Sequence, residues 1–94
     1  MNLFEFANSI ERCVGIYYRN YRWYVAFKSE DEDACITEKD LNGDYITPVG
    51  HGYTIAEAVN NYSDLISNKT LLFDRFWIQS EEVNVPTLEH IDKI

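Results

Sequence analysis

The stretch 50-GHGYTIAEAVNNYSDLIS-67 decides the fold of this chain, because it predicts one well-capped amphipathic helix. Thr54 and Glu57 match a capping box, in which each side chain accepts a hydrogen bond from the other residue's backbone N–H. Apolar residues then recur at helical spacing along one face: Ile55, Ala58, Val59, Tyr62, Leu65 and Ile66. Ser67-Asn68 can end the helix, since asparagine accepts left-handed backbone there. We therefore predict a helix over 55–67.

Gly50-His51-Gly52 stands just before this helix and allows two interpretations. A helix N-terminus attracts anions, so Gly50–Thr54 with His51 could form a small-ligand or nucleotide site. However, Glu57 already occupies the first turn, and no lysine follows as it would in a phosphate-binding loop. We expect a turn that leads into the helix, with His51 exposed, and keep ligand binding as an alternative.

Strand-like segments surround the helix. Residues 12–28 are rich in β-branched and aromatic side chains, and Asn20 suits a tight turn, so we predict a β-hairpin there. Further strands are expected within 34–40 and 45–49, with a turn at 41–44, and the segments 69–73 and 75–80 fit two strands or one strand broken by a bulge. Residues 2–11 fit a short helix or an edge strand, and a short helix is expected after Pro86. Strands followed by one long amphipathic helix predict an α+β fold. We expect three to five antiparallel strands with helix 55–67 packed on one face.

The 94 residues are enough for one domain, residues 1–94, and a hydrophobic content of 46% excludes a disordered chain. No run approaches the roughly 18 apolar residues of a membrane span, and no basic leader precedes an apolar stretch. We therefore expect a cytoplasmic protein that does not bind membranes. Cys13 and Cys35 could form a disulfide, but two reduced thiols are favoured in a chain without an export signal, and their spacing gives no zinc site. We expect no metal and no cofactor.

The net charge of −8 is distributed unevenly. Residues 1–28 hold four basic and two acidic side chains, whereas residues 29–51 hold seven acidic side chains and one basic one. Such an acidic chain is repelled by a phosphate backbone, so direct nucleic-acid binding is not expected. The acidic segment suits a basic partner instead. Its candidate contact residues are Glu30, Asp31, Glu32, Asp33, Asp40 and Asp44.

The hairpin interleaves aromatic rings with arginines and supplies a second set of candidates: Tyr18, Arg19, Tyr21 and Arg22. Tyrosine and arginine are enriched at the hot spots of protein interfaces. They also stack on bases, but the total charge favours a protein partner. The opposing interpretation is structural, with alternate rings in the core and the arginines at the hairpin end.

The residues Gly50, Gly52, Thr54, Glu57, Ala58, Asn61 and Tyr62 spell G-x-G-x-T-x-x-E-A-x-x-N-Y. Together with the strand-like WYVAFK at 23–28, this pattern resembles the β-β-β-α-β domain of HicB-like antitoxins, over residues 14–73. The segment 67–73, SNKTLLF, is similar to one in small phage proteins. Antitoxins of this family usually carry a separate DNA-binding segment, and the short acidic tail shows none. The resemblance therefore implies a stand-alone, phage-type binding protein.

We expect no enzyme, because no constellation of nucleophile, base and orienting group is visible. The hypothesis is a phage- or mobile-element-type inhibitor of a host nucleic-acid-binding defence protein, such as a CRISPR effector. The acidic residues would occupy its basic groove, and the tyrosines and arginines would anchor the contact. The alternatives are a HicB-like antitoxin that binds a small basic toxin, and the ligand-binding domain described above. Exposed sheet edges are compatible with a homodimer.

Overall fold

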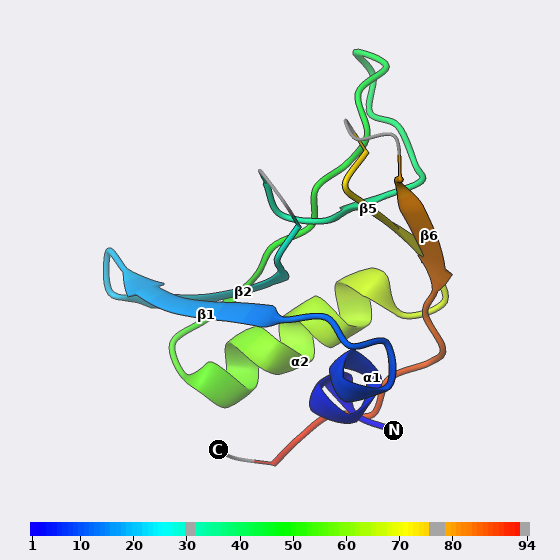
Figure 1. Ribbon diagram of the computed structural model, residues 1–94. Coiled ribbons are helices and arrows are strands. Elements are labelled where there is room, and N and C mark those ends of the chain that lie inside the picture. The colour runs from blue at the N-terminus through cyan, green and yellow to red at the C-terminus, as the bar shows by residue number, and fades with distance from the viewer. Residues whose placement is uncertain (30–31, 76–78, 93–94) are drawn as a thin grey trace.

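The computed structural model describes residues 1–29, 32–75 and 79–92, and its fold is α+β, as the sequence predicts (Figure 1). In chain order the elements are α1 (Leu3–Ser9), β1 (Val14–Arg19), β2 (Arg22–Phe27), β3 (Cys35–Ile36), β4 (Gly50–Gly52), α2 (Ile55–Ile66), β5 (Thr70–Phe73) and β6 (Glu81–Asn84). The strands form two antiparallel three-stranded sheets, ordered β1-β2-β4 and β3-β5-β6. The expected strands are thus divided between two small sheets.

Helix α2 confirms the strongest sequence prediction. The Thr54 hydroxyl accepts from the Glu57 N–H at 3.1 Å, and the Glu57 carboxylate accepts from the Thr54 N–H at 3.0 Å. The helix ends at Ile66, and Asn68 takes the left-handed conformation with φ 63°. One predicted stripe residue, Leu65, lies at the margin of the buried face and is 40% exposed.

The predicted turn at Gly50–Gly52 is wrong, because these residues form strand β4. Gly50 pairs with Val25 and Gly52 with Trp23, so β4 extends the hairpin sheet. The glycines are needed for close packing rather than for turning. A Cβ on Gly50 would lie 2.5 Å from the Ala58 carbonyl oxygen, and a Cβ on Gly52 would lie 2.5 Å from Glu57 Cβ. Helix α2 therefore rests directly on the backbone of β4.

The hairpin β1–β2 forms with the predicted turn at Asn20. The strand predicted at 69–73 forms as β5, and the remaining strand predictions are only partly correct. Within 34–40 the strand is limited to Cys35–Ile36, and 45–49 contains no strand. Instead, residues 37–46, called the arm below, form a projecting loop joined by a single bridge between Lys39 and Tyr45. The strand expected at 75–80 falls partly on residues outside those described, and β6 begins only at Glu81.

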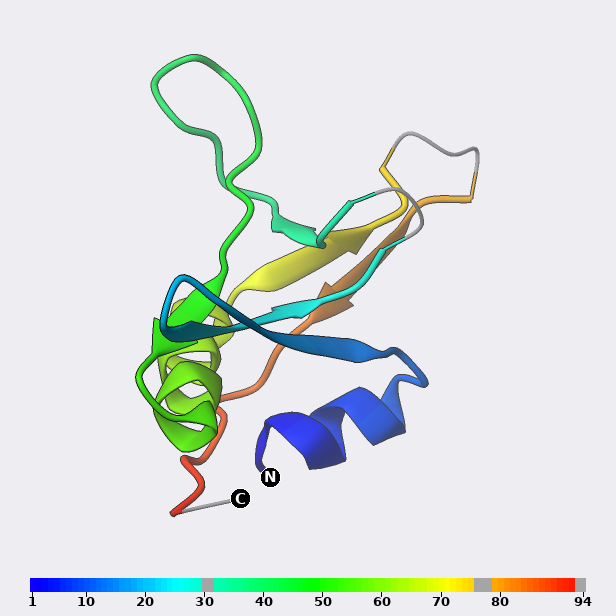
Figure 2. The same ribbon diagram turned by 90° about the vertical axis from the view of Figure 1, so that its left-hand side faces the viewer.

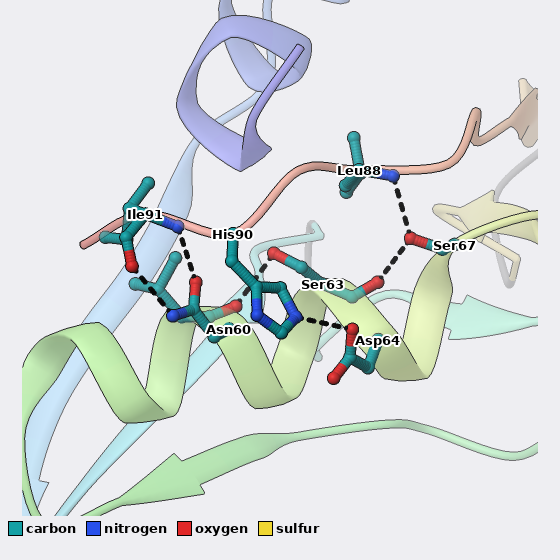
Figure 3. Close-up of polar contacts among 8 residues, drawn as sticks. Asn60, Ser63, Asp64, Ser67, Leu88, His90 and Ile91 are labelled. Carbon is teal, nitrogen blue, oxygen red and sulfur yellow. Dashed lines mark hydrogen bonds and ion pairs between the residues drawn. The ribbon is translucent and has the colours of Figure 1, made fainter.

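The helix expected after Pro86 does not form over the described residues 87–92, because the backbone there binds side chains of α2 and of its C-cap residue (Figure 3). The Asn60 side chain donates to the Ile91 carbonyl and accepts from the Ile91 N–H, both at 2.8 Å. The Ser67 hydroxyl accepts from the Leu88 N–H at 2.9 Å. These bonds replace the N–H to carbonyl bonds that a helix would form, and residues 85–92 run extended along α2.

Phe27 is the centre of the core. Its ring packs edge-on against Phe6 at 6.0 Å and against Phe73 at 5.7 Å, and it lies 6.1 Å from the Tyr62 ring. The buried Tyr62 hydroxyl accepts a hydrogen bond from the Phe27 N–H at 2.9 Å. Four elements, α1, β2, α2 and β5, therefore meet at one side chain, and this contact joins the two sheets.

Candidate partner-binding surfaces

The end of the hairpin, residues 18–22, is called the hairpin tip. Its two central residues, Asn20 and Tyr21, have φ values of 51° and 64°. This is the geometry of a two-residue type I′ turn, which normally favours glycine at the second position. Tyr21 occupies that position and is 85% exposed, and Tyr18 is 56% exposed. Arg19 is also exposed, so the tip presents aromatic and cationic groups to solvent.

Arg22 is held in place on the face of the β1-β2-β4 sheet that points away from α2. One guanidinium nitrogen lies 3.3 Å from His51 Nδ1, and another donates to the Tyr53 hydroxyl at 3.0 Å. The guanidinium also stacks 4.8 Å from the centre of the Tyr53 ring. Arginine carries only donors, so His51 Nδ1 can take only the acceptor role in this contact. His51 is exposed, as the sequence predicts, and it orients Arg22.

Tyr17 and Tyr24 continue this outer face. Their rings stack at 5.3 Å with an angle of 17° between the planes, and Lys28 Nζ lies 5.6 Å from the centre of the Tyr17 ring. Residues at alternate positions of a strand share one face, so Tyr17, Arg19, Arg22 and Tyr24 lie together here. Sequence alternation could not add His51, because that requires knowing that β4 pairs with β2.

The four consecutive acidic residues at 30–33, called the acidic loop below, are less available to a partner than the composition indicates. Glu30 and Asp31 lie outside the described residues. Glu32 pairs with Arg75 at 2.9 Å, and Asp33 pairs with Lys28 at 3.1 Å. Both carboxylates are therefore balanced by cations of the same chain.

Asp40 and Asp44 lie in the arm, which Figure 2 shows projecting away from the hairpin tip. The Asp40 carboxylate accepts from the backbone N–H groups of Asn42 and Asp44 at 2.8 and 3.1 Å, so it shapes the turn. Asp44 is exposed. Leu41 at the end of the arm is fully exposed, and sequence analysis did not identify it. The sequence could have indicated this exposure, because Leu41 stands directly before the turn residues Asn42-Gly43 and has no apolar neighbour at helix or strand spacing.

Within the described residues, the histidine, cysteine, aspartate and glutamate side chains form no cluster that could bind a metal ion. No group of three or more His, Cys, Asp and Glu side chains lies close enough together to hold a metal ion in that part of the chain. Both cysteines are free; Cys13 is exposed and Cys35 is buried. Burial raises the pKa of the Cys35 thiol, which keeps it protonated. His90 contacts Asp64 at 2.7 Å on the surface, beside the C-terminal segment (Figure 3).

Comparison with protein-family models, curated proteins and solved structures gives no match. The HicB-like resemblance therefore stays a prediction. Among the described residues, no helix is long and apolar enough to cross a membrane.

Proposed function

We propose that this chain is a non-enzymatic protein-binding domain anchored by its hairpin tip. The observation that carries the proposal is Tyr21, an 85% exposed ring on left-handed backbone with φ 64°. Left-handed backbone lowers the stability of the folded state by about 1–2 kcal/mol at a residue with a Cβ, and glycine avoids this cost. The exposed ring gains no burial in exchange within the chain. Strain retained at an exposed aromatic is typical of a functional contact.

The neighbours of Tyr21 support an anchor role. Tyr18 and Arg19 flank the turn, and aromatic and arginine side chains dominate interface hot spots. Arg22 is already oriented by His51 and Tyr53, so a partner would spend less conformational entropy on fixing it. The tip combines apolar area with a preorganised cation.

For the partner, we propose a host nucleic-acid-binding defence protein, which the chain inhibits as a phage- or mobile-element-type protein does. The support is the net charge of −8, which suits a basic groove that normally receives a phosphate backbone. Among the predicted acidic contacts, Asp44 is exposed at the end of the arm beside Leu41. Glu32 and Asp33 are balanced internally, so the arm is the stronger acidic contact.

One observation favours the antitoxin alternative. The three strands of the β1-β2-β4 sheet precede α2 and β5 follows it, which matches the β-β-β-α-β order of the HicB-like resemblance except that β3, a strand of the other sheet, lies between β2 and β4. The alternative predicts a small basic toxin as partner, whereas the inhibitor predicts a large nucleic-acid-binding protein. The identity of the bound protein therefore separates them.

The test is affinity capture from host extract with the wild-type chain and Tyr21→Gly. The variant places Asn-Gly in the turn, the preferred type I′ pair, so it should be as stable as the wild type or more so. We expect it to lose at least tenfold in affinity for the captured partner. Phe4→Ala, which removes an exposed ring from α1, is the matched control and should bind normally. Equal binding by Tyr21→Gly and wild type would refute the anchor.

A further inference from the structure

Strand β1 is an open sheet edge with little protection. It has six residues, whereas the other edge strands, β3, β4 and β6, have two, three and four. Edge strands are normally blunted by short length, charge or proline. The β6 edge carries Glu81 and Glu82, but Val14–Tyr18 has no charged residue and no proline. Its middle is accessible, since Ile16 and Tyr17 are each 38% exposed.

The backbone groups of this edge alternate in direction. The Lys28 N–H donates to the Cys13 carbonyl at 2.9 Å, which fixes Cys13 and Lys28 as a hydrogen-bonded pair. Bonded pairs alternate along an antiparallel ladder, so Gly15, Tyr17 and Arg19 bond to β2. Ile16 and Tyr18 therefore direct their N–H and C=O groups outward. Within the described residues, no other segment takes up these groups.

We propose that two copies of this chain pair antiparallel through β1, with Ile16 of each copy opposite Tyr18 of the other. The two-fold axis then passes beside Tyr17. In this register the outward groups of Ile16 and Tyr18 in one copy bond to those of Tyr18 and Ile16 in the other. The dimer is a continuous six-stranded sheet built from two β1-β2-β4 sheets.

The side chains of β1 are complementary to themselves in this register. Tyr17 faces Tyr17 of the second copy on the outer face, and Ile16 faces Tyr18 on the other. Aromatic–aromatic and aromatic–β-branched pairs each contribute roughly 0.2–1 kcal/mol across strands. Arg19 lies opposite Gly15, so no like charges meet.

The position of α1 selects among the registers that satisfy the same hydrogen-bond alternation. In Figures 1 and 2, α1 lies near the Val14 end of β1, and the half of β1 toward the turn extends past it. Centring the pair on Ile16 would move the second copy toward α1. Centring it on Tyr17 places Val14 opposite Asn20 of the turn, and centring it on Tyr18 places Ile16 there and shortens the ladder further. Tyr17 is therefore the centre that keeps the second copy away from α1 with the longer ladder.

The dimer does not rest on the proposed function. Backbone pairing uses Ile16 and Tyr18, whereas the proposed anchor, Tyr21, stays in the turn. Antiparallel pairing directs the two hairpin tips away from each other, so a dimer would present two anchors. Each copy carries a net charge of −8, so repulsion opposes association and added salt should strengthen it.

The first test measures the mass of the full chain by sedimentation equilibrium as its concentration rises. We expect a reversible change from 11.0 kDa to twice that value. Ile16→Lys places a charge on the edge and should give a monomer with unchanged circular dichroism, because Ile16 is outside the core cluster. Leu65→Lys is the matched control, since Leu65 is 40% exposed on α2, and it should still dimerise.

The second test reads the register. In a Cys13→Ser background, Tyr17→Cys should form an intermolecular disulfide on mild oxidation. The two Cα atoms of a non-hydrogen-bonded pair lie about 4.5 Å apart, within disulfide range. Arg19→Cys would face Gly15 and should not cross-link. A monomer at every concentration, a dimer that survives Ile16→Lys, or cross-linking through Arg19→Cys in place of Tyr17→Cys would each overturn the proposal. Tyr21→Gly should leave the mass unchanged, so this result is separable from partner capture.

Discussion

Replacing Gly50 by alanine tests the claim that α2 rests on the backbone of β4. The new methyl group would overlap Tyr62 Cβ and lie 2.5 Å from the Ala58 carbonyl oxygen and 2.6 Å from the Tyr62 N atom. Carbon contacts are normally about 3.5–4.0 Å, so the helix must move back by about 1 Å. Overpacking lowers the free energy of unfolding by about 1–3 kcal/mol. Because the overlapped atoms include backbone, which shifts less readily than a side chain, we expect a loss of about 2–3 kcal/mol for Gly50→Ala.

The measurement is urea unfolding followed by tyrosine and tryptophan fluorescence, together with the melting temperature. A loss of 2–3 kcal/mol should lower the melting temperature by roughly 10–20 °C in a domain of this size. Gly15→Ala is the control, because the three atoms nearest to its Cβ all belong to the flexible side chain of Lys28, which is 51% exposed. The free energy of unfolding of that variant should lie within about 1 kcal/mol of the wild-type value, since alanine is also preferred over glycine in a strand. Equal stability of the Gly50 and Gly15 variants would refute the packing argument.

Three further predictions concern stability and thiol chemistry. Thr54→Ala removes one half of the capping box and should cost about 1 kcal/mol in urea unfolding; no loss would show that Glu57 alone caps α2. Burial raises the pKa of Tyr62 above its ordinary 10.0 and that of Cys35 above 9.0, so the unfolded chain loses these protons first and stability should fall as pH rises past about 9. Tyr62→Phe should reduce that fall while costing about 1–3 kcal/mol at neutral pH, because the Phe27 N–H loses its acceptor; an unchanged pH profile would contradict the assignment. A thiol reagent should modify the exposed Cys13 at once and Cys35 only on unfolding, and equal rates for the two would show that Cys35 is not buried.

The helix and the hairpin could be predicted because their signals are local. The capping box at Thr54 and Glu57 and the apolar stripe of α2 lie within 13 residues of sequence, from 54 to 66. In the hairpin, the aromatic alternation and Asn20 at the turn are equally short-range. Hydrophobic spacing and turn chemistry act over such distances, so sequence patterns report them well.

The elements that were missed depend on contacts distant in sequence. The sequence of Gly50–Gly52 predicts a turn because the pattern does not show that these residues pair with β2. It also does not show that α2 packs so closely that side chains at Gly50 and Gly52 would not fit. The segment after Pro86 has helical spacing, but Asn60 and Ser67 bind its backbone first. The acidic loop was predicted to be available to a basic partner. Instead, Glu32 pairs with Arg75, which lies 43 residues away in sequence.

The position of the C-terminal segment has a consequence for folding kinetics. The Met1 carbonyl accepts from the Glu89 N–H at 2.9 Å, and the Met1 ammonium contacts the Glu89 carboxylate, 88 residues away in sequence. Val85 and Leu88 of the same segment are buried in the core. Closing so long a loop costs entropy before any contact compensates for it, and non-local pairing slows folding. A ribosome makes these residues after all the strands and both helices, so a nascent chain that ends before Val85 lacks part of its core. The core is therefore completed only after Val85 and Leu88 have been made.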